Sequence, residues 1–375
     1  MKKRLAILFL AILSFAGCSK ITQLTDTITN PSARERYARD YNGDELLFGQ
    51  WQTAYDAALS DSIEVGLPYI ESGAFKQNTA TAYSYVLKMK EGEIIEAAVE
   101  LDSVGRRVFI DIYKISAATP KKVEESKMGQ TAVSHSVDES GNYKVIIQPE
   151  IAASAHFNIV LSKSPLYGFP VAGKGNSAIQ SFWGFERDGG KRKHEGVDIF
   201  AKKGTPVVAV SDGIISDTGD RGLGGKQVWE RVDNFRYAIY YAHLNEINAT
   251  PGMRVKKGDT LGFVGNTGNA KGGPPHLHFG IYKYGAVDPL PFIYTTKTPN
   301  ATKLNGFSKQ FKNVVLGIAG AAANLRQQPS TSSPTIGTIQ KNEKATLLGE
   351  HGDWLHIRTS RGTQAFLHKS VAKAI

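Results

Sequence analysis

Two histidine-rich motifs constrain this chain more than any other feature. One reads His-x-x-x-Asp at residues 194–198, the other reads His-Leu-His at residues 276–278, and His243 lies between them. Imidazole and carboxylate groups in such a set are ligands for a divalent metal, with imidazoles left over for proton transfer. A catalytic zinc site takes three protein ligands and keeps a position open for water, whereas a structural site usually closes its shell with cysteine. The only cysteine, Cys18, is distant in sequence, so the pattern predicts a catalytic metal centre.

The second motif lies in an apolar and aromatic run, residues 276–282, which predicts a strand. Side chains alternate between the two faces of a strand. His276 and His278 should therefore project from one face. Leu277 and Phe279 should point into a core.

The other candidate residues also lie in or beside segments that predict extended chain. His194 and Asp198 are four residues apart in a segment that contains Gly and Val, and an extended chain would place them on one side. His243 ends a β-rich run, residues 236–243. Glu195 is adjacent to His194 and would be a tempting general base, but it should point to the other side of the chain, so we exclude it.

The ordered motifs of residues 166–295 resemble those of the lysostaphin-type peptidoglycan metallopeptidases. The resemblance rests on His-x-x-x-Asp, on Tyr-Ala-His-Leu and on Gly-Pro-Pro-His-Leu-His-Phe, with further similar stretches between them. Several ordered motifs over one domain are a stronger signal than a lone short pattern. The segments stand at residues 194–198, 204–207, 212–213, 241–244, 262–268 and 273–279.

The resemblance implies a β-sheet peptidase domain with one Zn²⁺ and a role for each residue. His194, Asp198 and His278 match the metal ligands of the family. His243 and His276 match its two catalytic histidines that do not bind the metal. One of these would take a proton from water and the other would stabilise the oxyanion, and histidine suits both roles because its pKa lies near working pH.

Two segments depart from the family pattern. Residues 274–275 hold one proline more than the commonest form of the motif, which stiffens the backbone there. Residues 221–234 match only loosely, and we expect them to form one wall of the substrate groove.

The implied function is that of a cell-wall hydrolase, a zinc-dependent endopeptidase that cuts peptide cross-links or bridges of peptidoglycan. The alternative is a non-enzymatic wall-binding lipoprotein that activates another peptidoglycan hydrolase through the same groove. Inactive relatives usually lack a ligand or a catalytic histidine, and this chain has the full set, which favours the enzyme. We interpret the remaining histidines as core or surface residues: His135, His156, His351, His356 and His368.

The start of the chain predicts export. A basic start and an apolar run over residues 5–15, too short to span a bilayer, predict a signal peptide over residues 1–17. Small residues before Cys18 resemble a bacterial lipobox, which would lipidate this cysteine and anchor the protein to a membrane. Ser19, rather than aspartate, favours the outer membrane facing the periplasm by the sorting rule of some Gram-negative bacteria. The alternative is an ordinary signal peptide with a chance cysteine.

The net charge of +10 is compatible with nucleic acid, an anionic membrane or an anionic polymer as partner. Nucleic acid is excluded as a partner, because no nucleic-acid motif is present and the chain is predicted to be exported. Peptidoglycan stems carry free carboxylates, so attraction to the wall is one interpretation of the charge. Solubility alone is the other.

The chain of 375 residues is long enough for two to three domains, and its patterns predict a mainly β protein. Short alternating segments such as residues 83–87 and 108–112 favour an antiparallel β-sandwich, whose role in spacing, sugar binding or regulation stays open. The predicted parts are a tether and short helix (18–45), the β-sandwich (46–165), the peptidase domain (166–297), a linker (298–313) and a small SH3-like barrel (314–375).

The C-terminal segment resembles bacterial SH3-like domains. The resemblance rests on residues 324–326, 352–357 and 362–366, and residues 316–323 are read as the first strand and its approach. In that family the barrel often binds cell-wall peptides, and the alternative is a barrel that only stabilises the protein. We expect a flexible linker to join it to the rest of the chain.

Overall fold

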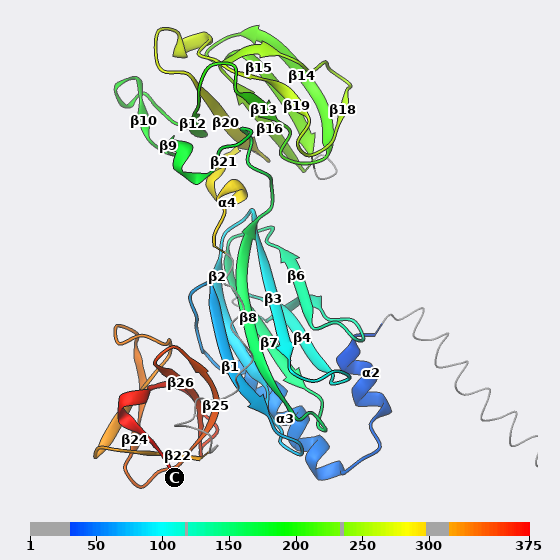
Figure 1. The fold of residues 1–375 in the computed structure, drawn as a ribbon, viewed down its shortest axis with the longest axis vertical. Helices are drawn as coiled ribbons and strands as arrows, with labels where there is room; N and C mark the ends of the chain where they lie inside the picture. Colours follow the sequence, from blue (N-terminus) through cyan, green and yellow to red (C-terminus); the bar gives the residue numbers. More distant parts are fainter. Residues whose placement is uncertain (1–30, 117–118, 233–235, 298–314) are drawn as a thin grey trace, which may run out of the picture.

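The computed structural model describes residues 31–116, 119–232, 236–297 and 315–375. The described chain is mainly β, as predicted, and forms a central domain, an N-terminal sandwich and a C-terminal barrel (Figure 1). No helix in these ranges is long and apolar enough to cross a membrane. The predicted signal peptide, Cys18 and the predicted linker lie outside the described residues.

The N-terminal body is an antiparallel β-sandwich. One layer has the strand order β1-β8-β3-β6 and the other has the order β2-β7-β4-β5. Tyr83, Tyr85 and Leu87 alternate into the core between the layers, as their period of two predicts. The strands are β1 (Tyr69–Phe75), β2 (Tyr83–Met89), β3 (Glu93–Leu101), β4 (Val108–Ile115), β5 (Lys121–Glu125), β6 (Ala132–Ser136), β7 (Gly141–Pro149) and β8 (Ala155–Pro165).

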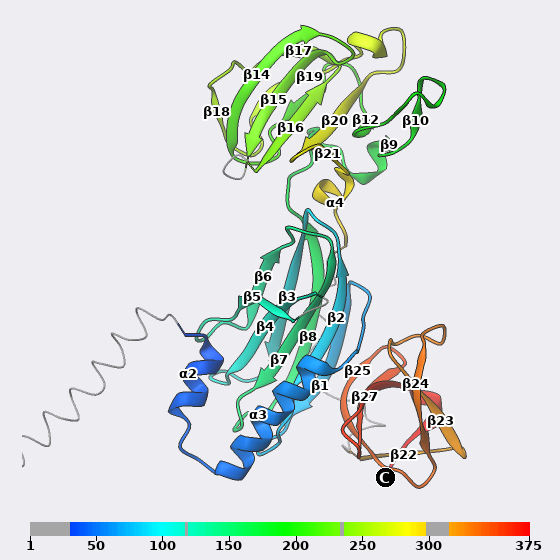
Figure 2. The ribbon, with the colours of Figure 1, turned by 180° about the vertical axis from the view of Figure 1, so that it is seen from behind.

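Two helices, α2 (Ala33–Asp40) and α3 (Glu45–Ser60), precede the sandwich and lie against it (Figure 2). The predicted start of the β-sandwich at residue 46 is wrong, because α3 covers this segment and its residues Trp51, Tyr55 and Ala58 recur at helical spacing and are buried. Lys144 of β7 donates from Nζ to the carbonyls of Ala58, Leu59 and Asp61 at the end of α3 (2.6–3.0 Å). A buried lysine thus satisfies carbonyls that the helix leaves unpaired.

The central domain holds an antiparallel sheet with the order β18-β14-β15-β16-β20-β12-β9, a smaller sheet β13-β19-β17 and a hairpin β10-β11. Its core lies between the two sheets. The elements are β9 (Ile179–Ser181), β10 (Glu186–Arg187), β11 (Arg192–Lys193), β12 (Val197–Phe200), β13 (Pro206–Val208), β14 (Gly213–Arg221), β15 (Gly225–Val232), β16 (Tyr237–Ala242), β17 (Leu244–Ile247), β18 (Arg254–Val255), β19 (Thr260–Val264), β20 (His276–Tyr282), β21 (Ala286–Val287) and α4 (Leu290–Ile293).

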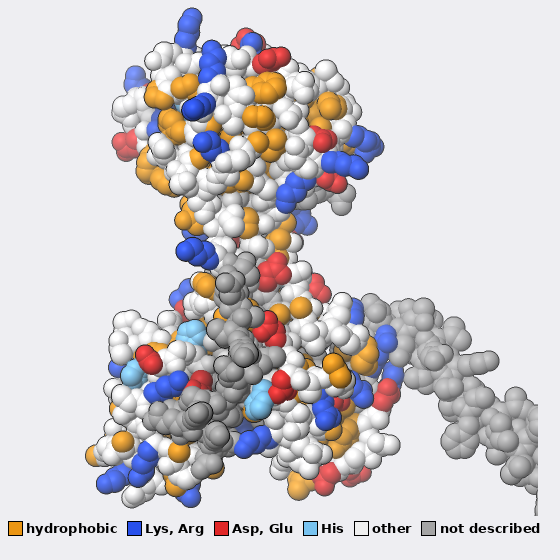
Figure 3. Space-filling view, in the orientation of Figure 1, with side chains coloured by type: hydrophobic (Ala, Val, Ile, Leu, Met, Phe, Trp, Pro, Cys, Tyr) orange, Lys and Arg blue, Asp and Glu red, His pale blue; other side chains and the backbone are white. Residues whose placement is uncertain are grey.

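A narrow waist joins the central domain to the sandwich (Figure 3). At this waist, Glu91 in the β2–β3 turn accepts hydrogen bonds from the Tyr237 hydroxyl (2.9 Å) and the Lys283 ammonium (2.8 Å). Leu166 also donates its backbone N–H to Gly92 (2.9 Å). Lys283 directly follows β20, so the sandwich contacts the end of the strand that carries His276 and His278.

The C-terminal body is a small barrel. Leu355, Ile357 and Leu367 are fully buried in its core. Its first strand begins close to the predicted position. The strands are β22 (Val315–Ile318), β23 (Ala322–Arg326), β24 (Thr335–Gln340), β25 (Ala345–His351), β26 (Trp354–Thr359), β27 (Gln364–His368) and β28 (Ala372–Ala374).

The barrel is packed on the sandwich rather than held by the linker alone. β25 pairs with β1 at Ser72 and Glu350, which joins the barrel and one sandwich layer in a single sheet. Leu348 and Phe366 of the barrel belong to the core of the sandwich. The expectation of a flexibly tethered barrel is therefore wrong, because its apolar side chains complete a core outside the barrel.

A fully buried polar cluster lies inside this junction. Glu71 of β1 and His356 of β26 are both 0% exposed, and His356 Nδ1 lies 3.0 Å from Oε1 of Glu71. The hydroxyls of Tyr69 (2.5 Å) and Tyr85 (3.0 Å) donate to Oε2 of the same carboxylate. A buried carboxylate is stable only when partners satisfy it, and His356 of the barrel is one of the partners of Glu71 of the sandwich.

Candidate metal centre

Two neighbouring strands bring three of the candidate residues together. β12 pairs with β20 so that Asp198 is directly opposite His278. His276 and His278 project from the groove face of β20, whereas Leu277 and Phe279 on the other face are fully buried in the core. The burial of alternate residues therefore fixes where the two imidazoles of this strand lie.

His194 reaches the same place from the end of the β10–β11 hairpin and is 2% exposed. Its Nδ1–H donates to the carbonyl of Phe182 (2.9 Å), so we assign the tautomer that leaves Nε2 free as a ligand. Gly196 makes the close approach possible. A Cβ there would lie 2.7 Å from Cε1 of His278 and 2.6 Å from the carbonyl oxygen of Phe279.

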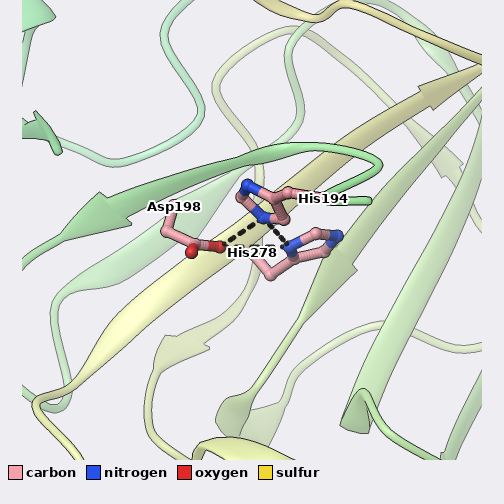
Figure 4. Close-up of side chains that lie close together, drawn as sticks. All are labelled: His194, Asp198 and His278. Atoms are coloured by element: carbon pink, nitrogen blue, oxygen red, sulfur yellow. Dashed lines mark hydrogen bonds and ion pairs between the residues drawn. The ribbon is translucent and has the colours of Figure 1, made fainter. Parts of the chain in front are cut away.

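The side chains of His194, Asp198 and His278 point toward one another (Figure 4). Nε2 of His194 lies 3.0 Å from Oδ1 of Asp198 and 3.0 Å from Nδ1 of His278, and the third separation is 3.1 Å. Donors bound to tetrahedral zinc at 2.0–2.1 Å are about 3.3 Å apart. Two imidazoles and a carboxylate at this separation fit a three-ligand zinc site.

Asp198 is held as an anion by its surroundings. Burial by itself would raise the pKa of this carboxyl, but hydrogen bonds and charge from His194 and His278 outweigh it and hold the pKa well below its usual range. Nη2 of Arg187 donates to Oδ2 (2.9 Å) and also to Oγ of Ser181 (2.5 Å). The carboxylate therefore presents Oδ1 to the metal position while the guanidinium holds Oδ2.

Sequence reasoning did not identify Arg187. The segment before His194 is rich in basic residues, but composition does not show which of them reaches the carboxylate. The contact depends on the hairpin folding back over β12.

His243 and His276 lie beside the three donors, with ring centroids 5.0 Å apart. Nδ1–H of His243 donates to the carbonyl of Thr267 (2.9 Å), and Nδ1–H of His276 donates to that of Pro274 (2.9 Å). These bonds assign both rings to the tautomer with an unprotonated Nε2. The bond to Pro274 also gives the proline-rich segment a role, because it orients His276.

His243 has an unusual backbone conformation and a buried imidazole ring. Its φ is +62°, a conformation that costs energy in a residue with a side chain, and its N–H donates to Gly224 (2.8 Å). Burial, followed by the nearby rings of His276 and His278, lowers the pKa of His243 to about 4. The ring is therefore neutral at pH 7 and can accept a proton.

The five residues lie in a groove of about 700 Å³. The charged β10–β11 hairpin forms one wall. Three aromatic residues on adjacent strands, Trp229, Tyr240 and Tyr282, line another part of it. Asn269 and Ala270 of the short 3-10 helix Gly268–Ala270 also line the groove.

Part of the predicted wall, residues 221–234, is confirmed, because Leu223, Gly224 and Trp229 line the groove. Asn269 donates its N–H to the carbonyl of Leu223 (3.0 Å). Gly268 has φ +65°, and a Cβ there would lie 2.3 Å from the same oxygen. The wall is therefore held by close backbone contacts.

The histidines that we interpreted as core or surface residues do not line the groove. His356 is fully buried at the sandwich–barrel junction, and the others lie on the sandwich or the barrel: His135, His156, His351 and His368. Glu195 lines the groove but is exposed and does not belong to the metal-binding group. Its exclusion as the general base stays a prediction.

Comparison with known families agrees with this architecture. Residues 192–289 match the family model of peptidase family M23, and residues 321–372 match that of the bacterial SH3 domain. The chain therefore contains an M23, lysostaphin-type peptidase domain followed by a bacterial SH3 domain.

Curated relatives match this chain mainly over a limited region. The L-Ala–D-Glu endopeptidase of Bacillus subtilis is 36% identical over 140 residues, which are 34% of this chain and 43% of the relative. Lysostaphin of Staphylococcus simulans is 34% identical over 161 residues, 41% of this chain and 28% of the relative. The peptidoglycan DD-endopeptidase ShyC of Vibrio cholerae is 35% identical over 124 residues, 32% of this chain and 26% of the relative. The chain thus spans less than half the length of these three relatives.

Among solved structures, the catalytic domain of lysostaphin from Staphylococcus simulans is 34% identical to this chain. The match covers 30% of this chain and 89% of that domain, with a TM-score of 0.28.

Proposed function

We propose that this protein is a zinc-dependent endopeptidase that cuts peptide cross-links or bridges of peptidoglycan. The observation that carries the proposal is the convergence of His194, Asp198 and His278, whose donor atoms all lie within 4.8 Å of one another in an open groove. The M23 match and the endopeptidase activities in the names of its relatives support the same class.

His194, Asp198 and His278 would hold a zinc ion, which would polarise a carbonyl and bring the pKa of a bound water towards neutrality. Nε2 of His243 or of His276 takes the proton of the attacking water, because Nδ1–H of each ring is already bonded to a carbonyl. The imidazole that takes the water proton then gives it to the leaving amine nitrogen. The other imidazole, protonated from solvent, donates from Nε2–H to the developing oxyanion. Arg187 keeps Asp198 oriented throughout.

The proposal extends to where the protein acts. The predicted signal peptide and the lipobox-like residues before Cys18 support a lipoprotein anchored through Cys18, with Ser19 favouring the outer membrane and the periplasmic side. The bacterial SH3 domain supports binding to peptidoglycan. Its packing on the sandwich means that any such binding acts through a rigid pair of domains.

Digestion of purified sacculi, with separation and mass analysis of the products, tests the proposal. The relatives act by name on different bonds, so the masses also identify the bond. Release of peptide fragments that His276→Ala abolishes supports an endopeptidase. If fragments appear only when a second hydrolase is added, and His276→Ala does not reduce them, the protein is a non-enzymatic activator instead.

A further inference from the structure

Only some of the charged side chains along the groove form ion pairs with one another. Arg187 is bonded to Asp198, and Arg192 is bonded to Asp188. The groove also contains two exposed charged residues on either side of His194, Lys193 and Glu195, and neither forms an ion pair with any described residue.

Lys193 ends β11 and Glu195 follows two positions later, and both side chains line the same groove. An extended chain spaces two such residues about 6.6 Å apart at Cα. One carries a positive and the other a negative charge. A ligand group with a single charge is attracted by one of them and repelled by the other. A group that carries both an ammonium and a carboxylate complements the pair.

An aromatic surface lies next to Glu195. The ring of Trp229 lies 4.4 Å from that of Tyr240 and 5.1 Å from that of Tyr282, centroid to centroid, and all three rings are partly exposed. Gly280 lies between Glu195 and Tyr282, since a Cβ there would lie 3.2 Å from the carbonyl oxygen of Glu195 and 3.0 Å from the Tyr282 ring. Aromatic rings and a carboxylate together favour an ammonium group.

The distance between this aromatic surface and the metal position determines which residue of a bound peptide can reach the surface. Tyr282 is four residues beyond His278 on β20, which is about 13 Å along a strand. Between them, Gly280 has no side chain, and a Cβ there would lie 3.0 Å from the ring of Tyr282. An extended peptide covers about 3.3–3.6 Å per residue. The peptide residue whose charged group reaches this surface therefore lies within about four positions of the cleaved bond.

We infer that Lys193, Glu195 and the rings of Trp229, Tyr240 and Tyr282 form a subsite for an amino-acid zwitterion. The matching group is the free ammonium and carboxylate at the side-chain end of a diamino dicarboxylic residue. This inference rests on the proposed function and specifies its substrate as a stem peptide that carries such a residue. A bridge made only of glycine has no side chain for the subsite.

Peptide binding to the zinc-loaded His276→Ala protein tests the subsite without cleavage. The probes are a stem peptide with a free side-chain zwitterion, the same peptide with that carboxylate amidated, and the same peptide with that ammonium acetylated. We expect each modification to weaken binding by about three- to fivefold, the effect of one partly exposed ion pair. Adding Lys193→Gln should remove only the response to amidation, and adding Glu195→Gln only the response to acetylation.

Lys191→Gln is the matched control, because Lys191 is exposed on the same hairpin but does not line the groove. It should leave both responses unchanged. Equal binding of the three peptides to the His276→Ala protein would overturn the inference. Unchanged responses to amidation and acetylation after Lys193→Gln and Glu195→Gln are added would overturn it as well. Digestion of sacculi by the unsubstituted protein, scored in parallel, separates the two ideas. If sacculi are digested but the three peptides bind equally, the subsite alone is refuted. If the peptides bind differently but sacculi are not digested, the proposed endopeptidase alone is refuted.

Discussion

Replacing His356 by leucine should destabilise the sandwich and the barrel together. The substitution leaves the Glu71 carboxylate fully buried, with only the hydroxyls of Tyr69 and Tyr85 as partners. Losing a hydrogen bond to a buried charged group costs about 1.5–3 kcal/mol. Since a domain is stable by only about 5–15 kcal/mol, the loss is a large fraction of the total.

A double-mutant cycle assigns this cost to the pair. Glu71→Gln removes the buried charge, so His356→Leu should cost about 1–3 kcal/mol less in that background than alone. Urea unfolding of each variant measures the free energies, and His368→Leu, which replaces a partly exposed barrel histidine, is the control. A cost below about 1 kcal/mol for His356→Leu, or separate unfolding of barrel and sandwich, would refute the rigid junction.

The same pair predicts how stability depends on pH. Burial would raise the pKa of Glu71, but His356 and the tyrosine hydroxyls outweigh it and lower the pKa below the ordinary 4.5. A carboxyl with a lowered folded-state pKa contributes its full stability above its unfolded pKa and loses it as pH falls through the folded value. Stability of the parent protein should therefore fall below about pH 4.5, and Glu71→Gln should remove that part of the dependence.

Further predictions concern the site and the anchor. Asp198→Ala should lose stoichiometric zinc in metal analysis, and full retention would show the ligand assignment to be wrong. His243→Ala should keep zinc but lose about 10²–10⁴-fold in turnover; near-normal rates would remove it from the mechanism. Arg187→Gln should weaken zinc binding about 10–100-fold in chelator competition, whereas Arg192→Gln should not. Cys18→Ser should abolish lipid labelling and release the protein from membranes; unchanged membrane association would require another anchor.

The parts of the site that depend on local pattern could be predicted from sequence. Strand alternation places His276 and His278 on one face, and the structure agrees. Ordered motifs also predicted that His194 and Asp198 would lie together with His278. In both cases the information lies in short segments, because period and spacing are local properties.

The parts that depend on long-range packing could not be predicted. Glu71 and His356 are 285 positions apart, and neither lies in a pattern that marks it as buried and paired. Arg187 reaches Asp198 only because of how its hairpin folds. Helix α3 was missed for a different reason, since its buried residues Trp51 and Tyr55 follow a helical period in a segment that we assigned to the β-sandwich.

The most direct test of the account is digestion of sacculi in water labelled with heavy oxygen. Hydrolysis of a peptide bond by water places one labelled oxygen in each new carboxyl terminus, which mass spectrometry of the released peptides detects. We predict labelled termini with the parent protein, none after removal of metal by a chelator, and recovery when zinc is restored. His276→Ala should give none in any of these conditions. The account is contradicted if no peptide bond is cut, or if cleavage continues unchanged in the metal-free protein.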